Sequence, residues 1–182
     1  MSIRLARPED APRLASVHIT AWLETYRGIM PDKVLDELSL GRSTEGWSKR
    51  LAAVPNRQAV FVACNDEEQV IGFAAAGPKR LPELPSDGEI FAINLINSAK
   101  RKGYGLRLMQ TAAEHLIANN FEAIGLWVLE RNQAARAFYE RLGGAALTQR
   151  EERFGVSTLS ELGIIWNPAS ALRDHATTLI NA

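Results

Sequence analysis

The segment that restricts the fold most is a strand, a helix and a second strand over residues 89–129. EIFAINLI (89–96) and AIGLWVL (123–129) are apolar runs of strand length. Between them, apolar residues recur at helical spacing after Gly103: Leu106, Met109, Ala113, Leu116 and Ile117. A helix that joins two buried strands predicts that the strands are parallel, which places the chain in the α/β class.

The rest of the chain predicts further helices and strands around this unit. Helices are expected after Asp10, from Pro31, over about 44–53 and after Asn132. Strands are expected at 3–6, 59–64, 69–76, 145–153 and 158–166. We therefore expect a single domain over residues 1–168, with a mixed and mostly antiparallel sheet flanked by helices. The order of the tail, residues 169–182, is left open.

Two connections have a clear local signal. Polar residues 65–68 separate two strand-like runs, which predicts an antiparallel hairpin. The segment PKRLPELPSDG (78–88) contains three prolines and one glycine. Because these residues interrupt helices and strands, this segment is expected to be an exposed loop.

The composition argues against several classes of protein. The 21 Lys and Arg residues balance 21 Asp and Glu residues, so no general affinity for nucleic acid or for a membrane is expected. No apolar run approaches the roughly 18 residues of a membrane span, and the first residues do not resemble a secretory signal, so we expect a cytoplasmic protein. Cys64 is the lone cysteine and the three histidines are scattered, so neither a disulfide nor a metal site is expected.

Three consecutive cations, Lys100, Arg101 and Lys102, precede the turn Gly103-Tyr104-Gly105. A glycine turn that opens a helix presents free backbone N–H groups and the positive end of the helix dipole, which together suit a phosphate. A Walker loop is absent, and a dinucleotide fingerprint would need glycine where Leu108 stands. The loop alone leaves open a basic, solvated turn without a ligand.

The segment 89–144 resembles the GNAT superfamily of acyl-CoA N-acyltransferases in both of its signature regions. KRKGYG (100–105) fits the diphosphate loop Q/R-x-x-G-x-G/A, with lysine in the first position. LWVLERNQAARAFYERLGG (126–144) is similar to the second signature, in which an asparagine opens a helix and a tyrosine faces the cofactor sulfur; here these are Asn132 and Tyr139. Residues 18–40 look more loosely like the PaiA type of polyamine acetyltransferase.

The resemblance implies acetyl-CoA as the acyl donor, without a metal. By position, the residues expected to bind it are Ile93, Asn94, Leu95, Lys100, Arg101, Lys102, Gly103, Tyr104, Gly105, Leu106 and Asn132. The backbone N–H of Ile93, with that of Leu95, is expected to stabilise the oxyanion. For Asn132, a plain helix cap is the alternative. Trp22 and Tyr26 are candidates for the acceptor pocket, although aromatic residues four apart on a helix also suit a core.

Two side chains are the catalytic candidates. Acyl transfer needs a neutral amine, and an alkylamine with a pKa of about 10.4 is mostly charged at neutral pH, so a base is required. Glu89 matches a position where some family members carry a catalytic glutamate; the alternative is a strand-end carboxylate in solvent. Tyr139 is the candidate acid for the departing thiolate; the alternative is a core tyrosine.

The function that the resemblance implies is transfer of an acetyl group to the primary amine of a small molecule. Two other functions stay open, namely acetylation of a protein or peptide amine and non-catalytic sensing of acyl-CoA. The sequence does not fix the oligomeric state, and a homodimer is one of the options.

Overall fold

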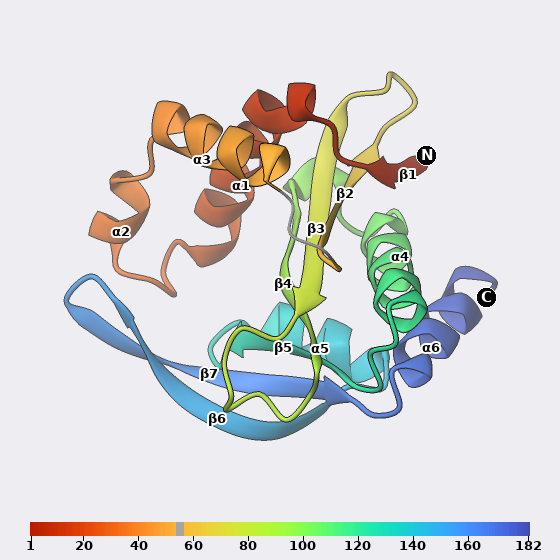
Figure 1. The fold of residues 1–182 in the computed structure, drawn as a ribbon. Helices are drawn as coiled ribbons and strands as arrows, with labels where there is room; N and C mark the ends of the chain where they lie inside the picture. The colour runs from red at the N-terminus through yellow and green to blue at the C-terminus, as the bar shows by residue number, and fades with distance from the viewer. Residues whose placement is uncertain (54–56) are drawn as a thin grey trace.

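A computed structural model describes residues 1–53 and 57–182 of the chain. The strands form one sheet in the order β1-β2-β3-β4-β5-β7-β6 (Figure 1). Their bounds are β1 Ser2–Leu5, β2 Ala59–Cys64, β3 Val70–Pro78, β4 Gly88–Leu95, β5 Ile124–Leu129, β6 Ala145–Phe154 and β7 Ser157–Trp166. The β4–β5 pair is parallel and the other neighbours are antiparallel, which confirms the expected mixed sheet and the crossover.

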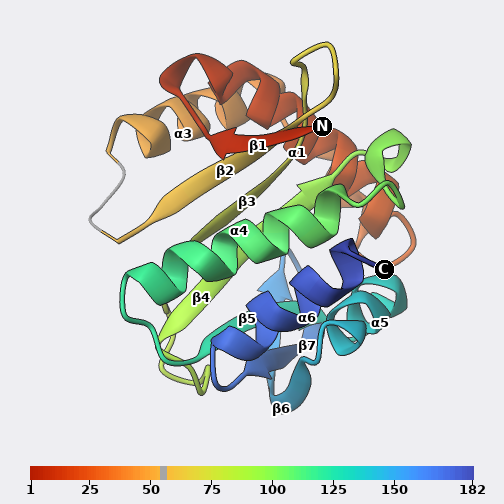
Figure 2. The same cartoon turned by 90° about the vertical axis from the view of Figure 1, so that its right-hand side faces the viewer.

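Helices cover both faces of the sheet. One face carries α4, α5 and α6, which lie on the near side in Figure 2, and the other carries α1 and α3. The helix bounds are α1 Ala11–Tyr26, α2 Asp32–Asp36, α3 Leu40–Ala52, α4 Tyr104–Ala118, α5 Gln133–Arg141 and α6 Ser170–Ile180, with short 3₁₀ turns at Pro8–Asp10 and Asn97–Ala99. Helix α3 begins four residues before the expected position 44, because Ser39 caps it by accepting a hydrogen bond from the backbone of Arg42.

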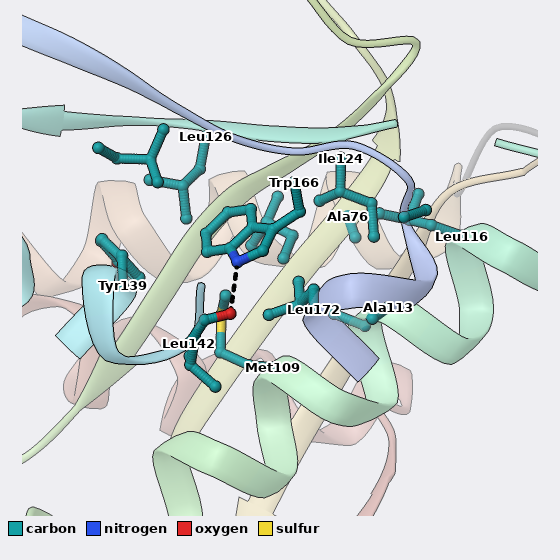
Figure 3. Packing of buried hydrophobic residues seen from close by; sticks show 14 of the residues in the cluster. Ala76, Met109, Ala113, Leu116, Ile124, Leu126, Tyr139, Leu142, Trp166 and Leu172 are labelled. Atoms are coloured by element: carbon teal, nitrogen blue, oxygen red, sulfur yellow. Dashed lines mark hydrogen bonds between the residues drawn. The ribbon is translucent and has the colours of Figure 1, made fainter. Parts of the chain in front are cut away.

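The largest apolar cluster lies between the sheet and the helices α4, α5 and α6. Trp166, fully buried, donates a hydrogen bond from its indole nitrogen to the backbone oxygen of Leu142 at 2.8 Å (Figure 3). Leu172 and Ala176 of α6 are buried in the same cluster. The tail, whose order the sequence left open, therefore completes the core as a helix against α4.

Strands β4 and β5 pair over a short distance and then diverge. Their register includes only Gly88 with Ile124 and Glu89 with Gly125. Beyond this point β4 continues to Leu95 along β3 alone, so its other edge faces a gap. The side chains of residues 91–95 are accordingly half-buried, although β4 is a central strand of the sheet.

The connection between β3 and β4 is a loop with mostly exposed residues, as its prolines predicted, but one part of it is buried. Leu84 in this connection is fully buried. It lies over two strand glycines, and a methyl group added at Gly125 or Gly163 would approach it to 2.8 or 3.2 Å. Because neither glycine has a side chain, the connection folds down onto β5 and β7.

Candidate active site

The glycine turn leaves the first backbone N–H groups of α4 without partners inside the helix. Gly103 caps the helix with φ 85°, a left-handed conformation that glycine adopts without steric cost. The first backbone bond of the helix runs from the N–H of Arg107 to the oxygen of Gly103. The preceding N–H groups of Tyr104, Gly105 and Leu106 thus have no helical acceptor. A methyl group added at Gly103 would meet only Met1, at 3.8 Å, so the turn is also sterically open.

The three cations before the turn have different environments. Lys100 donates from Nζ to the hydroxyl of Thr25 on α1, at 3.2 Å. Nearby, Glu24 accepts a hydrogen bond from the backbone N–H of Asn97 at 2.6 Å, which joins α1 to the same segment. Arg101 and Lys102 are exposed, and neither has an ion-pair partner within the described part of the chain. Two of the three predicted cations are therefore free to meet a phosphate.

A β-bulge in β4 decides which backbone groups face the gap. Ala75 pairs with Ala92 but Ala76 pairs with Ile90, so Phe91 is the extra residue. After the bulge, the backbone N–H of Ile96 donates a hydrogen bond to the backbone oxygen of Ile71 in β3.

Because hydrogen-bonded and non-bonded pairs alternate in an antiparallel ladder, Asn94 bonds to β3 while Ile93 and Leu95 point their N–H groups into the gap. The backbone N–H groups of Ile93 and Leu95 are therefore not bonded to β3, which leaves them available for the roles predicted from sequence. The N–H of Asn94 is engaged with β3, which leaves its side chain as its available group.

Glu89 lies at the point where β4 and β5 separate, on the face covered by α1 and α3. Its side chain is only 1% exposed, so the alternative of a carboxylate in solvent is wrong. Arg80 donates to it from the backbone N–H at 2.8 Å, from Nε at 3.2 Å and from Nη2 at 2.5 Å. The Arg80 guanidinium also lies over the ring of Phe91, with 4.6 Å from Cζ to the ring centroid. Glu89 is therefore a buried, ion-paired carboxylate.

Tyr139 is buried on α5, where its ring lies edge to face with that of Trp166 (Figure 3). Burial, together with nearby Tyr26, raises the pKa of Tyr139 well above its usual value. The phenol therefore keeps its proton throughout the neutral range. Asn132 caps this helix by accepting a hydrogen bond from the backbone of Ala135 at 3.2 Å, so the alternative role as a helix cap is confirmed, and its role toward the cofactor stays a prediction.

The two aromatic residues predicted for the acceptor pocket lie side by side on α1. The rings of Trp22 and Tyr26 are 5.3 Å apart, edge to face, and both pack against the apolar cluster that contains Leu129 of β5. Burial, followed by the charge of Glu161, raises the pKa of Tyr26, and the nearby polar side chain of Asn132 opposes this effect. Tyr26 thus reaches the residues around Tyr139, and Trp22 supports it from within the apolar cluster.

The family is decided by a match over most of the chain. The sequence model of the Acetyltransferase (GNAT) family matches residues 18–144. The chain belongs to the GNAT family of acetyltransferases. It is 32% identical over 181 residues to the uncharacterized N-acetyltransferase YuaI of Bacillus subtilis, covering 100% of this chain and 99% of that protein. It is 28% identical to the probable N-acetyltransferase Rv2775 of Mycobacterium tuberculosis, over 76% of each chain.

Solved structures show the same fold. The PaiA N-acetyltransferase of Thermoplasma acidophilum, in complex with coenzyme A, superposes with a TM-score of 0.73 at 18% identity, over 91% of this chain and 98% of that one. The ribosomal-protein-alanine N-acetyltransferase of Brucella melitensis gives 0.70 at 20% identity, over 92% and 99%. The expected GNAT fold and the expected class of enzyme, an N-acetyltransferase, are confirmed.

Sequence reasoning missed a second buried ion pair in this acetyltransferase. Glu161 on β7 accepts hydrogen bonds from Arg150 on β6, at 2.8 Å from Nε and 2.6 Å from Nη2. The same guanidinium lies over the ring of Trp127 on β5, 4.4 Å from its centroid. Arg150 and Glu161 are directly opposite each other in the β6–β7 hairpin. Because they carry opposite charges and lie equally far from the turn, their positions in the sequence could have predicted this ion pair.

The described residues of the acetyltransferase offer neither a cluster of metal ligands nor a helix that could span a membrane. Within residues 1–53 and 57–182, the acidic, histidine and cysteine side chains form no group of three or more that could hold a metal ion. Over the same residues, each helix is too short or too polar to cross a membrane.

Proposed function

We propose that this enzyme transfers the acetyl group of acetyl-CoA to the primary amine of a small molecule, by direct attack of the amine on the thioester. The observation that carries the proposal is the gap between β4 and β5. The free N–H groups of Ile93 and Leu95 line it, α4 begins near one end, and Glu89 stands where the strands meet. Two fold neighbours, solved with coenzyme A or acetyl-CoA, support the choice of donor.

Two elements would bind acetyl-CoA: the start of α4 would hold the diphosphate, and the edge of β4 would hold the pantetheine arm. The free N–H groups at the start of α4, with Arg101 and Lys102, suit the diphosphate because backbone donors and cations meet there. Gly103 and Gly105 allow close approach of the backbone, and the side chain of Tyr104 is buried, so its contribution is its N–H group. The edge of β4 at Ile93 and Leu95 offers donors to the amide groups of pantetheine, and Asn132 stands on the other side at the start of α5.

The base that we assign is Glu89. A protonated alkylamine must lose a proton, because only about one in 10³ molecules is neutral at pH 7. Two of the three donors of Arg80 bind Oε1 and one binds Oε2, so Oε2 keeps an unused acceptor position. A water molecule held there would pass the proton from the amine to the carboxylate, which is the route that we favour over direct contact.

Residues of β4 and α5 are assigned to the two remaining steps, which are stabilisation of the oxyanion and protonation of the departing thiolate. The N–H of Ile93 would stabilise the negative charge that develops on the carbonyl oxygen, since a fixed backbone donor in a gap needs no reorganisation. Tyr139 would donate its proton to the departing sulfur, and its raised pKa favours the protonated form that this role needs.

A thiol-release assay with acetyl-CoA tests this function over polyamines, amino acids, aminoglycosides and peptides. Turnover with a small amine that requires Glu89 and Tyr139 is the expected result. Release only with peptides would instead favour acetylation of protein amines. Tight binding of coenzyme A without release on any acceptor would favour an acyl-CoA sensor.

A further inference from the structure

A small cavity of about 100 Å³ opens beside Arg80, the ion-pair partner of Glu89, on the face covered by α1 and α3. Its walls include Arg50 from the end of α3, Gln58, Arg80 and Phe91. None of the described residues that line it is acidic. The cavity is therefore a positively charged recess beside the reaction centre, and its size suits a carboxylate or a similar group.

Arg80 is held at this cavity with part of its guanidinium unused. Phe91, the bulged residue of β4, lies over Gly77, where an added methyl group would come within 3.1 Å of the ring. The ring in turn supports the flat face of Arg80. Glu89 accepts from Nε and Nη2 of Arg80, which leaves the Nη1 hydrogens for another acceptor.

The positive charge of Arg80 is paired with Glu89, and Arg50 adds a second positive charge that has no such partner. Its guanidinium stacks on the ring of Trp47 at 5.0 Å, and it has no carboxylate partner within the described part of the chain. Burial, followed by the charge of Arg80, lowers the pKa of Arg50. The two guanidinium groups therefore repel each other, and an anion bound between them would relieve that repulsion.

We propose that the cavity at Arg50 and Arg80 binds an anionic group of the acceptor, so that the acceptor is an amine that also carries a carboxylate or another oxyanion. This inference rests on the proposed function. Phe91 in the cavity wall is two residues before Ile93, which corresponds to about 6.6 Å along a strand. An amino acid or a short amino phosphonate spans this distance, whereas a polyamine would place cations against two arginines.

The first test measures anion binding without turnover. The protein is saturated with coenzyme A, so that the phosphate loop is filled, and is then titrated with glutarate at constant ionic strength while thermal unfolding is followed. Glutarate should raise the Tm of the parent protein, because a ligand of the folded state stabilises it. Arg50→Gln should abolish the rise. An equal rise in Arg50→Gln and in the parent protein would overturn the proposal.

Lys49→Gln is the matched control for this titration. It removes one positive charge from the same turn of α3, but Lys49 pairs with Glu45 at 2.6 Å and does not line the cavity. The control should keep the response to glutarate. If Arg50→Gln does not fold, Gln58→Glu is the second variant: it places a negative charge in the cavity wall and should also abolish the response.

The second test compares acceptors in pairs, such as β-alanine with its carboxamide and 4-aminobutyrate with its carboxamide. The parent enzyme should favour the acid of each pair in kcat/KM by about tenfold or more. Arg50→Gln should bring the ratio close to one, and Lys49→Gln should keep it. A parent enzyme that prefers the carboxamides or polyamines would overturn the proposal.

The two tests separate the failure of this inference from the failure of the proposed function. An Arg50-dependent response to glutarate without thiol release on any amine would leave the anion site standing and would remove the acetyl-transfer proposal. Thiol release on neutral amines with no Arg50-dependent response to glutarate would support the acetyl-transfer proposal and would remove the anion site.

Discussion

Glu89 and Arg80 form an ion pair across the connection between β3 and β4, with 2.5 Å between Nη2 and Oε1. The carboxylate is 1% exposed and the arginine side chain is 54% exposed, so the buried negative charge is paired with a cation at the protein surface. A buried carboxylate without its partner would be strongly unfavourable. Arg80 therefore stabilises the buried carboxylate of Glu89 at the point where β4 and β5 separate.

The first prediction concerns this ion pair. Arg80→Ala should lower the free energy of unfolding by about 1–3 kcal/mol, because it leaves a buried acceptor without its side-chain donors. Urea denaturation measures the change. Adding Glu89→Gln to the same protein should restore part of the loss, since the uncompensated charge is gone. Strictly additive effects of the two substitutions would contradict this account.

A second prediction concerns the glycine turn. Gly103→Glu should weaken the binding of acetyl-CoA by about tenfold or more, because it places bulk and negative charge where the diphosphate is expected. Isothermal calorimetry measures the affinity. Gly103→Asn is the matched control, since asparagine tolerates the left-handed φ of 85° without adding charge. Equal affinities of the Glu variant and the parent would remove the turn from the cofactor site.

The glycine turn before α4 and the helix α5 were predictable from sequence because their signals are local. The cations and glycines of residues 100–105 are contiguous, and Asn132 and Tyr139 lie on one short helix. The strands were equally clear, since apolar runs bounded by polar turns carry a strong signal. The sequence also predicted that Asp10 caps α1, and its side chain does not do so. The Asp10 carboxylate instead accepts a hydrogen bond from the backbone N–H of Arg7 and forms an ion pair with Arg4.

The environment of Glu89 was not predictable, because it depends on register and on distant glycines. The alignment of β3 with β4 is set by the bulge at Phe91, which no local pattern announces. The burial of Leu84 depends on Gly125 and Gly163, which become neighbours only when β5 pairs with β7. These relationships are tertiary, so they appear in the structure and not in any short window of sequence.

The third prediction tests the base. Glu89→Gln should reduce kcat/KM at neutral pH and recover part of the loss as the pH rises, because more of the amine is then neutral without help. Steady-state kinetics over the range from about pH 7 to pH 10 measure this profile. The affinity for acetyl-CoA should not change, which serves as the control. An equal loss at every pH would point to a structural role.

The fourth prediction concerns His18, whose ring meets Trp22, Trp47 and Phe73 edge to face. Burial, followed by the charge of Arg50, lowers the pKa of His18 from 6.5 to about 4. In the unfolded chain the histidine binds a proton below about pH 6.5, but in the folded protein it does so only near pH 4, so stability is lost as the pH falls through this window.

Urea denaturation at pH 7 and pH 4.5 measures this effect. Between these values the parent protein should lose about 2 kcal/mol through His18, and His18→Phe should lose correspondingly less because phenylalanine does not titrate. Identical acid dependence of the two proteins would contradict the assignment.

The last prediction concerns Tyr139, whose ring is fixed against Trp166 and whose hydroxyl makes no hydrogen bond within the described part of the chain. Tyr139→Phe keeps the ring, so the Tm and the affinity for acetyl-CoA should be retained. It removes the proton donor, so kcat should fall by about 10²-fold, the lower end of what a positioned acid contributes.

Tyr26→Phe is the matched control, because it removes a neighbouring phenol that is not assigned to proton transfer. This control should alter KM for the amine more than kcat, since Tyr26 borders the predicted acceptor pocket. Normal turnover by Tyr139→Phe would mean that the tyrosine only packs the core. The thiolate would then leave unprotonated or take its proton from water.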